Sequence, residues 1–207
     1  MTRVCLVGNG DVNLRYELLS RETSRQALAT YDLREPFENA VGVRTVSLGA
    51  AVALLNDLDW YLVRFVEEAM VLEPSVSDGE WLSRDLATAL RDDQVTPAES
   101  ARFLKVYGLE GGGDRDDGTP GEGSVEAAGG RGADSPHEDS GAGPAGSEPE
   151  AGSGPDGRGE SEPERASPPR LVEPMYVTRT GETIPEYDLR DVEETVVERV
   201  TEDEFGA

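Results

Sequence analysis

The residue types that most often carry catalysis or bind metals are nearly absent from this chain. Its 207 residues include one histidine, His137, one cysteine, Cys5, and one lysine, Lys105. A zinc site made of His and Cys, a CxxC redox pair and an internal disulfide all need more of these side chains than the chain has. His137 is also the only possible base for a Ser–His–Asp triad. We therefore predict no catalytic, cofactor-binding or metal-binding residue, and we favour a protein that is not an enzyme.

One run, from Val7 to Asn13, suggests a nucleotide site. Its sequence Val-Gly-Asn-Gly-Asp-Val-Asn starts like G-x-G-x-x-G, in which the glycines let the backbone approach a pyrophosphate. However, Asn13 stands at the third glycine position, and no helix start is evident directly after it. A turn at the exit of a strand explains the same residues, because Gly, Asn and Asp all favour turns. We favour the turn.

Carboxylates are so abundant that clusters of them carry little information. The clusters that could hold a divalent cation beside a phosphate are Asp57 with Asp59, and Asp188 with Asp191, Glu193 and Glu194. With 43 acidic residues, such clusters arise on any solvated surface. A magnesium-dependent enzyme that uses Asp, Glu and Arg without His or Cys is the alternative. It would need a pocket where carboxylates meet Arg15, Arg44, Arg64 or Tyr61.

The net charge is the most unusual feature of the composition. It amounts to −24, and 18 of the 19 basic residues are arginine. Residues 111–170 carry −9 and the remainder −15, so the acidity is spread along the chain. Self-repulsion of this size is costly in dilute buffer, but the Debye length falls to about 3 Å at 1 M salt. We interpret the charge as adaptation to molar salt in an extreme halophile.

Residues 111–170 form a compositional break. They hold 16 of the 24 glycines and 8 of the 13 prolines, with Val125 as the only large apolar residue. Such a segment cannot bury enough apolar surface to offset its ordering entropy. We therefore predict a disordered Gly/Pro/Glu/Asp-rich insertion, which contains His137. Residues 1–110 and 171–207 should then form one domain around it, because loop closure entropy grows slowly with length.

The hydrophobic pattern predicts an α+β fold, with a small mixed sheet covered by three or four helices. Alternating β-branched residues indicate strands near 3–7, 41–47, 174–178 and 194–200. A capping box at 23–26 indicates a helix to about Tyr31. Residues 49–71 fit one amphipathic helix, or a shorter helix followed by a strand from Trp60 to Val66. We favour the single helix.

Two further capping boxes, at 77–80 and 96–99, predict a helical hairpin over residues 79–108. A hairpin of this kind could place its second helix in the DNA major groove. That helix offers Arg102 and Lys105 but also Glu99, and DNA readers need several basic or amide side chains there. A nucleic-acid-associated regulator is therefore an alternative function, and simple helix packing is the favoured interpretation.

Three stretches carry a resemblance to a known family: the opening Met-Thr-Arg-Val-Cys-Leu-Val-Gly, residues 46–66, and Tyr-Asp-Leu-Arg-Asp-Val-Glu-Glu-Thr-Val-Val at 187–197. Together they resemble a family of small haloarchaeal proteins classed only as a domain of unknown function. The resemblance covers 1–110 and 171–207. It implies a halophilic source but transfers no activity and no functional residue.

The sequence therefore favours a soluble cytoplasmic accessory or protein-interaction protein. We expect a protein partner or a homo-oligomer, and nucleic acid is the less favoured partner. No apolar run reaches the about 18 residues of a membrane helix, and the first residues lack the layout of a signal peptide. A single cysteine is typical of a reducing compartment, so we expect the cytoplasm.

Overall fold

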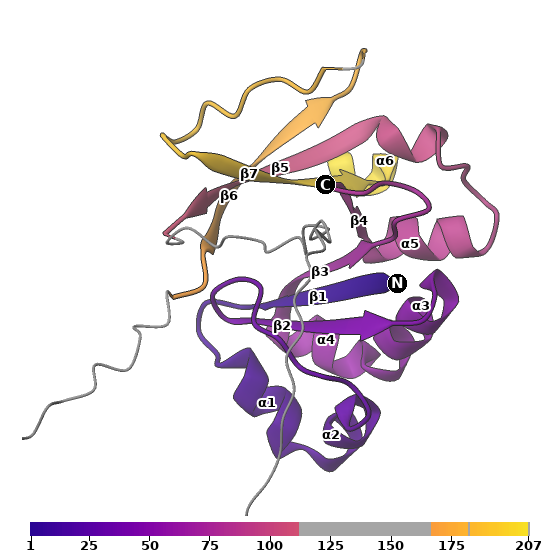
Figure 1. The fold of residues 1–207 in the computed structure, drawn as a ribbon, viewed down its shortest axis with the longest axis vertical. Helices are drawn as coiled ribbons and strands as arrows, with labels where there is room; N and C mark the ends of the chain where they lie inside the picture. The colour runs from indigo at the N-terminus through magenta and orange to yellow at the C-terminus, as the bar shows by residue number, and fades with distance from the viewer. Residues whose placement is uncertain (112–166, 182, 207) are drawn as a thin grey trace, which may run out of the picture. The chain divides into compact units, whose positions relative to one another are not determined.

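The computed structural model of the chain describes residues 1–111, 167–181 and 183–206. Within them lie seven strands: β1 (Thr2–Gly8), β2 (Ala40–Thr45), β3 (Val66–Leu72), β4 (Trp81–Ser83), β5 (Phe103–Glu110), β6 (Arg170–Thr178) and β7 (Glu194–Val200). The helices there are α1 (Leu14–Ser20), α2 (Glu22–Leu28), α3 (Leu48–Asp57), α4 (Asp59–Phe65), α5 (Arg84–Arg91), α6 (Glu202–Phe205) and a 3-10 turn, η1 (Glu99–Ala101). The predicted α+β class is confirmed (Figure 1).

The strands form one mixed sheet in the order β2-β1-β3-β4-β7-β5-β6. All neighbouring pairs are antiparallel except β4 and β7, which run parallel. β4 is short: it pairs with β3 through two residues and with β7 through two. Among the described residues, the pairings of this three-residue strand are therefore the only backbone ladders that join β1–β3 to β5–β7.

The sheet curls until its two edges meet. β2 and β6 are the edge strands, and six strand spacings of about 4.8 Å would separate them by about 29 Å in a flat sheet. Yet the backbone N–H of Glu38, just before β2, donates to the carbonyl of Pro169, just before β6, at 2.8 Å. Figure 1 shows β6 reaching toward the turn that follows β1. The inner face of the curled sheet is thereby partly closed off from solvent.

Apolar side chains on the outer face of β1–β4 pack against the helices and form the main core. Alternation in β1 points Val4 and Leu6 to this face, where they join Leu55 of α3 and Leu86 of α5. A second, smaller cluster lies on the inner face and includes Cys5, Met70, Tyr107 and Val196. A third covers the other face of β5–β7 beneath the loop that carries Tyr187. The inner cluster is the one next to the charged residues described below.

The four predicted strands are all present, but three more were not foreseen. Residues 49–71 are neither of the two predicted arrangements: α3 and α4 run to Phe65, and β3 follows. The favoured single helix is wrong because the chain leaves the helical conformation at Val66 (φ −107°, ψ 130°). β3 then pairs with β1 along its whole length, which adds a ladder of backbone hydrogen bonds that the local pattern does not reveal.

The helical hairpin over 79–108 is wrong. Trp81–Ser83 is strand β4, and α5 starts only after it, with the Ser83 hydroxyl accepting from the backbone N–H of Leu86. The capping box of Thr96 and Glu99 exists, but it opens only the short turn η1 before strand β5. The nucleic-acid hypothesis therefore loses its recognition helix, because that segment pairs with β6 and β7.

The capping box at 23–26 is also wrong. The N-cap of α2 is Arg21, two residues before Thr23, and no side chain caps the helix. The predicted insertion, apart from its ends at 111 and 167–170, lies outside the described residues, as does His137. In the part of the chain that is described, no helix combines the length and apolar character that a bilayer crossing requires.

Candidate functional site

Three charged or polar side chains from non-adjacent strands meet on the inner face of the sheet. Lys105 of β5, the one lysine of the chain, donates through Nζ to Oε2 of Glu68 on β3. The hydroxyl of Tyr107, two residues along β5, donates to the same oxygen at 2.6 Å. The side chains of Lys105 and Glu68 are only 13% and 19% exposed. Because β4 and β7 lie between β3 and β5, these bonds tie together the two parts of the curled sheet.

Glu198 of β7 is the most unusual residue of the structure. It is fully buried, and its register partners are Lys105 on one side and Trp81 on the other. Neither carboxylate oxygen accepts a well-formed hydrogen bond among the described residues: the nearby hydroxyl of Tyr107 donates to Glu68, and it makes only the smallest contribution to lowering the pKa of Glu198. Burial, followed by the charge of Glu68, raises the pKa of Glu198 well above its ordinary value, and Lys105 only partly offsets this. Burial therefore favours the protonated form of Glu198 more than it would be favoured at an exposed glutamate.

Glu68 and Tyr107 also line a cleft of about 630 Å³. Its walls come from the end of β1 and its turn, the loop before β2, and β6. Gly8 and Gly10 of the nucleotide-like run lie on its edge, so the structure does bring that run next to a cavity. A phosphate bound by the glycine turn would therefore have to lie in this cleft.

Several backbone amides of this turn are already in use. Gly8 N donates to the carbonyl of Asn39, and Asn9 N to that of Phe65. Leu14 N donates to the side-chain oxygen of Asn39 at 2.9 Å. A helix does begin directly at Leu14, contrary to our reading, with Asn13 as its N-cap. It is two turns long, and its first free amides are capped by Asn13 and Asn39, so the run acts as a structural turn.

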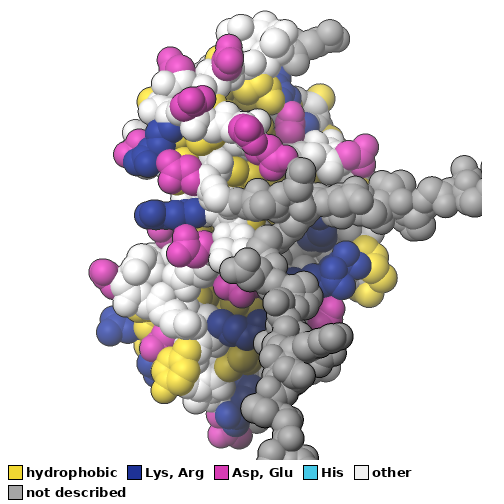
Figure 2. All heavy atoms as spheres, turned by 60° about the vertical axis from the view of Figure 1, so that its left-hand side comes forward, with side chains coloured by type: hydrophobic (Ala, Val, Ile, Leu, Met, Phe, Trp, Pro, Cys, Tyr) yellow, Lys and Arg dark blue, Asp and Glu magenta, His cyan; other side chains and the backbone are white. Residues whose placement is uncertain are grey.

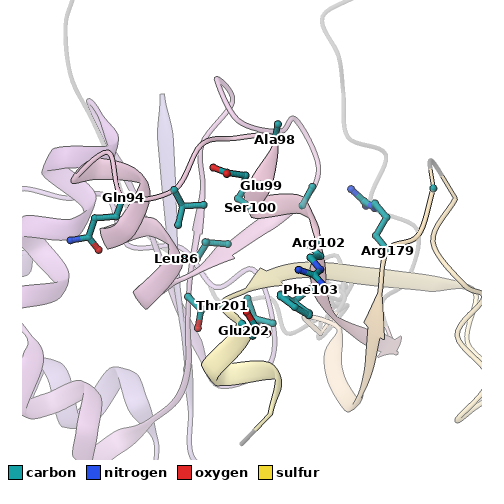
Figure 3. A pocket seen from close by; sticks show the side chains of 14 residues that line it. Leu86, Gln94, Ala98, Glu99, Ser100, Arg102, Phe103, Arg179, Thr201 and Glu202 are labelled. Atoms are coloured by element: carbon teal, nitrogen blue, oxygen red, sulfur yellow. The ribbon is translucent and has the colours of Figure 1, made fainter.

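A network of arginines lies behind a second pocket, of about 610 Å³ (Figure 3). Glu80, just before β4, accepts from Arg199 Nε at 2.5 Å and from Arg179 Nη2 at 2.5 Å. Arg199 also donates to the hydroxyl of Ser100 at 3.0 Å. Burial raises the pKa of Glu80, but the hydrogen bonds from the two arginines outweigh it and lower that pKa overall. This network fixes η1 and the ends of β6 and β7 around one carboxylate.

The pocket itself is electrically balanced. Figure 3 shows Arg102 and Phe103 on one wall and Glu99 on another. Glu99 already accepts from the backbone N–H of Thr96 and from its hydroxyl, at 3.0 and 2.7 Å. The guanidinium of Arg102 lies over the Phe103 ring, 4.9 Å from its centroid, and the lining has two acidic residues, Glu99 and Glu202, beside two arginines, Arg102 and Arg179. The pocket therefore does not select a charged ligand.

The sequence candidates for a magnesium enzyme do not come together. Asp59 pairs with Arg84 at 2.6 Å, and Asp57 is exposed. The described residues hold no group of three or more His, Cys, Asp or Glu that could bind a metal. The four side chains expected to meet carboxylates come from three elements: Arg15 from α1, Arg44 from β2, and Arg64 and Tyr61 from α4. Figure 2 shows acidic and basic side chains intermixed over one face, as expected of a solvated surface.

One helix presents an apolar and basic surface to solvent. On α4, Trp60 is 55% and Val63 81% exposed, whereas Tyr61, Leu62 and Phe65 face the core. The guanidinium of Arg21 lies over the Trp60 ring, 5.4 Å from its centroid. Arg64 lies next to them on the same side of the helix and has no ion pair among the described residues. We name Arg21, Trp60, Val63 and Arg64 the α4 face.

Comparison with known proteins gives a family but no activity. The model of the Family of unknown function (DUF5804) matches residues 2–109. The chain belongs to this family. The DUF5804 match spans β1 to β5, and so includes Glu68, Lys105, Tyr107 and the α4 face, whereas Glu198 lies outside it. No curated protein and no solved structure matches the chain.

The cluster of Glu68, Lys105 and Glu198 escaped sequence analysis for a simple reason. Its members are 37 to 130 residues apart and lie on strands, two of which were not predicted. One signal was available: Lys105 is the only lysine of the chain. A lysine kept in a chain that otherwise uses arginine indicates a place where a compact ammonium on a flexible stem is needed.

Proposed function

We propose that this chain is a protein-interaction protein that binds its partner through the α4 face. The observation that carries this proposal is the exposure of Trp60 and Val63 beside two arginines. Trp and Arg are the residue types most enriched among energetically dominant interface positions. Trp60 is also held in place by edge contacts with Tyr61 and Phe65, at centroid distances of 5.1 and 5.9 Å, so it loses little conformational freedom on binding.

Charge complementarity supports a partner segment with an apolar side chain flanked by Asp or Glu. The chain carries −24, yet the α4 face contributes two guanidinium groups, of which Arg21 forms an ion pair with Glu17 at 3.4 Å and Arg64 forms none among the described residues. Because the Debye length is about 3 Å at molar salt, only carboxylates in direct contact with the two guanidinium groups would be attracted here. This arrangement favours orientation and specificity of docking, and its strength should fall with salt.

The test compares baits in native lysate at molar KCl. The full chain, the double variant Trp60→Ala with Val63→Asp, and the control Tyr16→Ala are immobilised side by side. Tyr16 is 69% exposed on α1 and outside the α4 face, so it matches Trp60 in type and exposure. A protein retained by the wild type and by Tyr16→Ala should bind the double variant about 30-fold more weakly.

Three outcomes would overturn the proposal. The same protein could be retained equally by all three baits. Nucleic acid could be retained instead of protein and depend on the α4 face. The bait could retain only a second copy of itself and run as a dimer whose dissociation depends on Trp60. Each of these assigns the α4 face to a different occupant, or to none.

We also propose that the chain works in the cytoplasm of an extreme halophile. The support is the charge of −24 with a single lysine and a single cysteine. Between about 0.1 M and about 3 M KCl the Debye length falls from about 10 Å to under about 3 Å, which removes most of the self-repulsion. The thermal midpoint should therefore rise steadily over this range. A midpoint that is flat or falls with KCl would contradict the halophilic origin.

A further inference from the structure

Two carboxyl groups on the inner face of the sheet share one hydrogen-bonded cation, while Arg3 lies over the Trp81 ring and Arg170 and Arg190 line the cleft. Glu68 and Glu198 are two carboxyl groups served by a single ammonium, that of Lys105. Lys105 stands directly opposite Glu198 in the β5–β7 ladder, yet its hydrogen bond goes to Glu68 on β3. The other ionisable groups facing Glu198 are Cys5 of β1, Tyr107 of β5 and Glu204 of α6, and Tyr176 of β6 faces Lys105. None of them is a second cation.

The position of this cluster gives it mechanical consequences. In the described chain, the two parts of the sheet are joined by backbone pairing only through the three residues of β4. Lys105 and Tyr107 add side-chain hydrogen bonds that hold β3 against β5. Glu68 and Tyr107 also form the floor of the 630 Å³ cleft. Any event that removes Lys105 from Glu68 therefore loosens the cleft floor.

We propose that Glu198 is a proton-controlled clamp for this cleft. While Glu198 carries its proton, Lys105 is free to hold Glu68, and the two parts of the sheet stay together. When Glu198 releases its proton to solvent, a charged carboxylate with no hydrogen-bond partner is left in the interior, opposite Lys105. Lys105 then turns to Glu198, Glu68 loses its ammonium partner, and water enters along the cleft floor.

The physical reason is the cost of an unpaired buried charge. A carboxylate with no partner in the protein interior is strongly destabilised, whereas a paired or hydrated one is not. The four-carbon stem of lysine lets one ammonium reach either carboxylate, which the planar fork of arginine does less readily. Opening therefore takes place with Glu198 ionised, so each opening event releases one proton.

Cys5 reports this opening directly. It is the only cysteine of the chain, it is fully buried, and it belongs to the inner cluster beneath the cleft with Tyr107. The experiment measures the rate at which N-ethylmaleimide alkylates Cys5 in the full native chain at molar KCl, across a pH series. In an opened molecule the thiolate fraction alone makes this rate rise tenfold per pH unit. Proton release from Glu198 adds a second factor of ten.

The wild type should therefore gain about a hundredfold in rate per pH unit, and Glu198→Gln, which has no proton to release, about tenfold. Glu194→Gln, on the same strand but exposed, is the control and should behave as the wild type. Low urea should leave the wild-type rate unchanged, because local opening exposes little surface. A wild-type alkylation rate that rises only tenfold per pH unit overturns the proposal, whatever the variants show. A hundredfold slope in Glu198→Gln, or a rate that follows global unfolding in urea, also overturns it.

Discussion

Glu198 and Lys105 are direct partners in the β7–β5 ladder, but the ammonium of Lys105 bonds to Glu68 on a strand three places away in the sheet. The carboxyl group of Glu198 is thereby buried without a well-formed hydrogen bond from the part of the chain that the structure describes. This arrangement is costly, since buried polar groups are normally satisfied. It is tolerated only while Glu198 stays neutral, and this sets the first prediction.

The stability of the wild type should fall as the pH rises above the ordinary range of a glutamate. The pKa of Glu198 is raised in the folded chain by burial and by Glu68, from a starting value of 4.5. A carboxyl group whose pKa is higher in the folded than in the unfolded chain stabilises the fold fully at a pH below its unfolded pKa. This stabilisation is lost as the pH rises from the unfolded pKa toward the folded one. The loss amounts to about 1.4 kcal/mol per pH unit over that window. Glu198→Gln should remove this slope in urea unfolding at several pH values, and an unchanged slope would contradict the assignment.

Replacing Glu80 by Gln should destabilise the chain by about 3 kcal/mol, because it leaves Arg199 buried without its carboxylate. The pKa of Glu80 is lowered, so its contribution is present above pH 4.5 and is lost as the pH falls through the lowered value. Urea unfolding at neutral and acid pH measures both effects. Asp32→Asn is the control: it breaks an exposed pair with Arg34 and should cost less than about 1 kcal/mol. Equal losses for the two variants would show that the Glu80 network adds nothing to stability.

The two glycines of the first turn should respond differently to alanine. A Cβ at Gly8 would lie 2.6 Å from Nδ2 of Asn39 and 2.7 Å from Cβ of Leu14, whereas one at Gly10 meets nothing within 4 Å. Gly8→Ala should cost about 1–3 kcal/mol by overpacking, and Gly10→Ala less than about 0.5 kcal/mol. Thermal unfolding separates the two. A large loss of stability in Gly10→Ala would mean that the turn does more than connect β1 to α1.

Deleting residues 112–166 and joining the ends with a flexible linker should leave the unfolding midpoint at molar KCl nearly unchanged. We propose that 1–110 and 171–207 form one domain around this segment, and the cut preserves β5 and β6 in full. Extending the deletion through 170 is the control. It removes the carbonyl of Pro169, which accepts from Glu38, and the first residue of β6, so it should lower the midpoint. A large effect of the shorter deletion would show that the segment packs on the domain.

Local patterns were sufficient for strands whose residues alternate, such as β1 and β7, and for the α+β class. They failed where a distant partner decides the conformation. Glu67 and Glu68 fit the polar side of a helix, and the backbone ladder that β3 forms with β1 decides for a strand there. Ser77 has a glutamate three residues later, which is the pattern of a capping box, whereas the N-cap of α5 is Ser83, whose hydroxyl accepts from the backbone N–H of Leu86. The clamp depends on register between strands far apart in sequence, which no single sequence contains.

The α4 face is the central claim about function, and a hydrogen-exchange footprint tests it most directly. The full chain is measured alone and with the captured partner at molar KCl. We predict slower amide exchange confined to residues 59–65 and the region of Arg21, with no change in β5 to β7. Slower exchange at the cleft around Gly8, Glu68 and Tyr107, with α4 unaffected, would contradict the account and assign recognition to the inner face of the sheet.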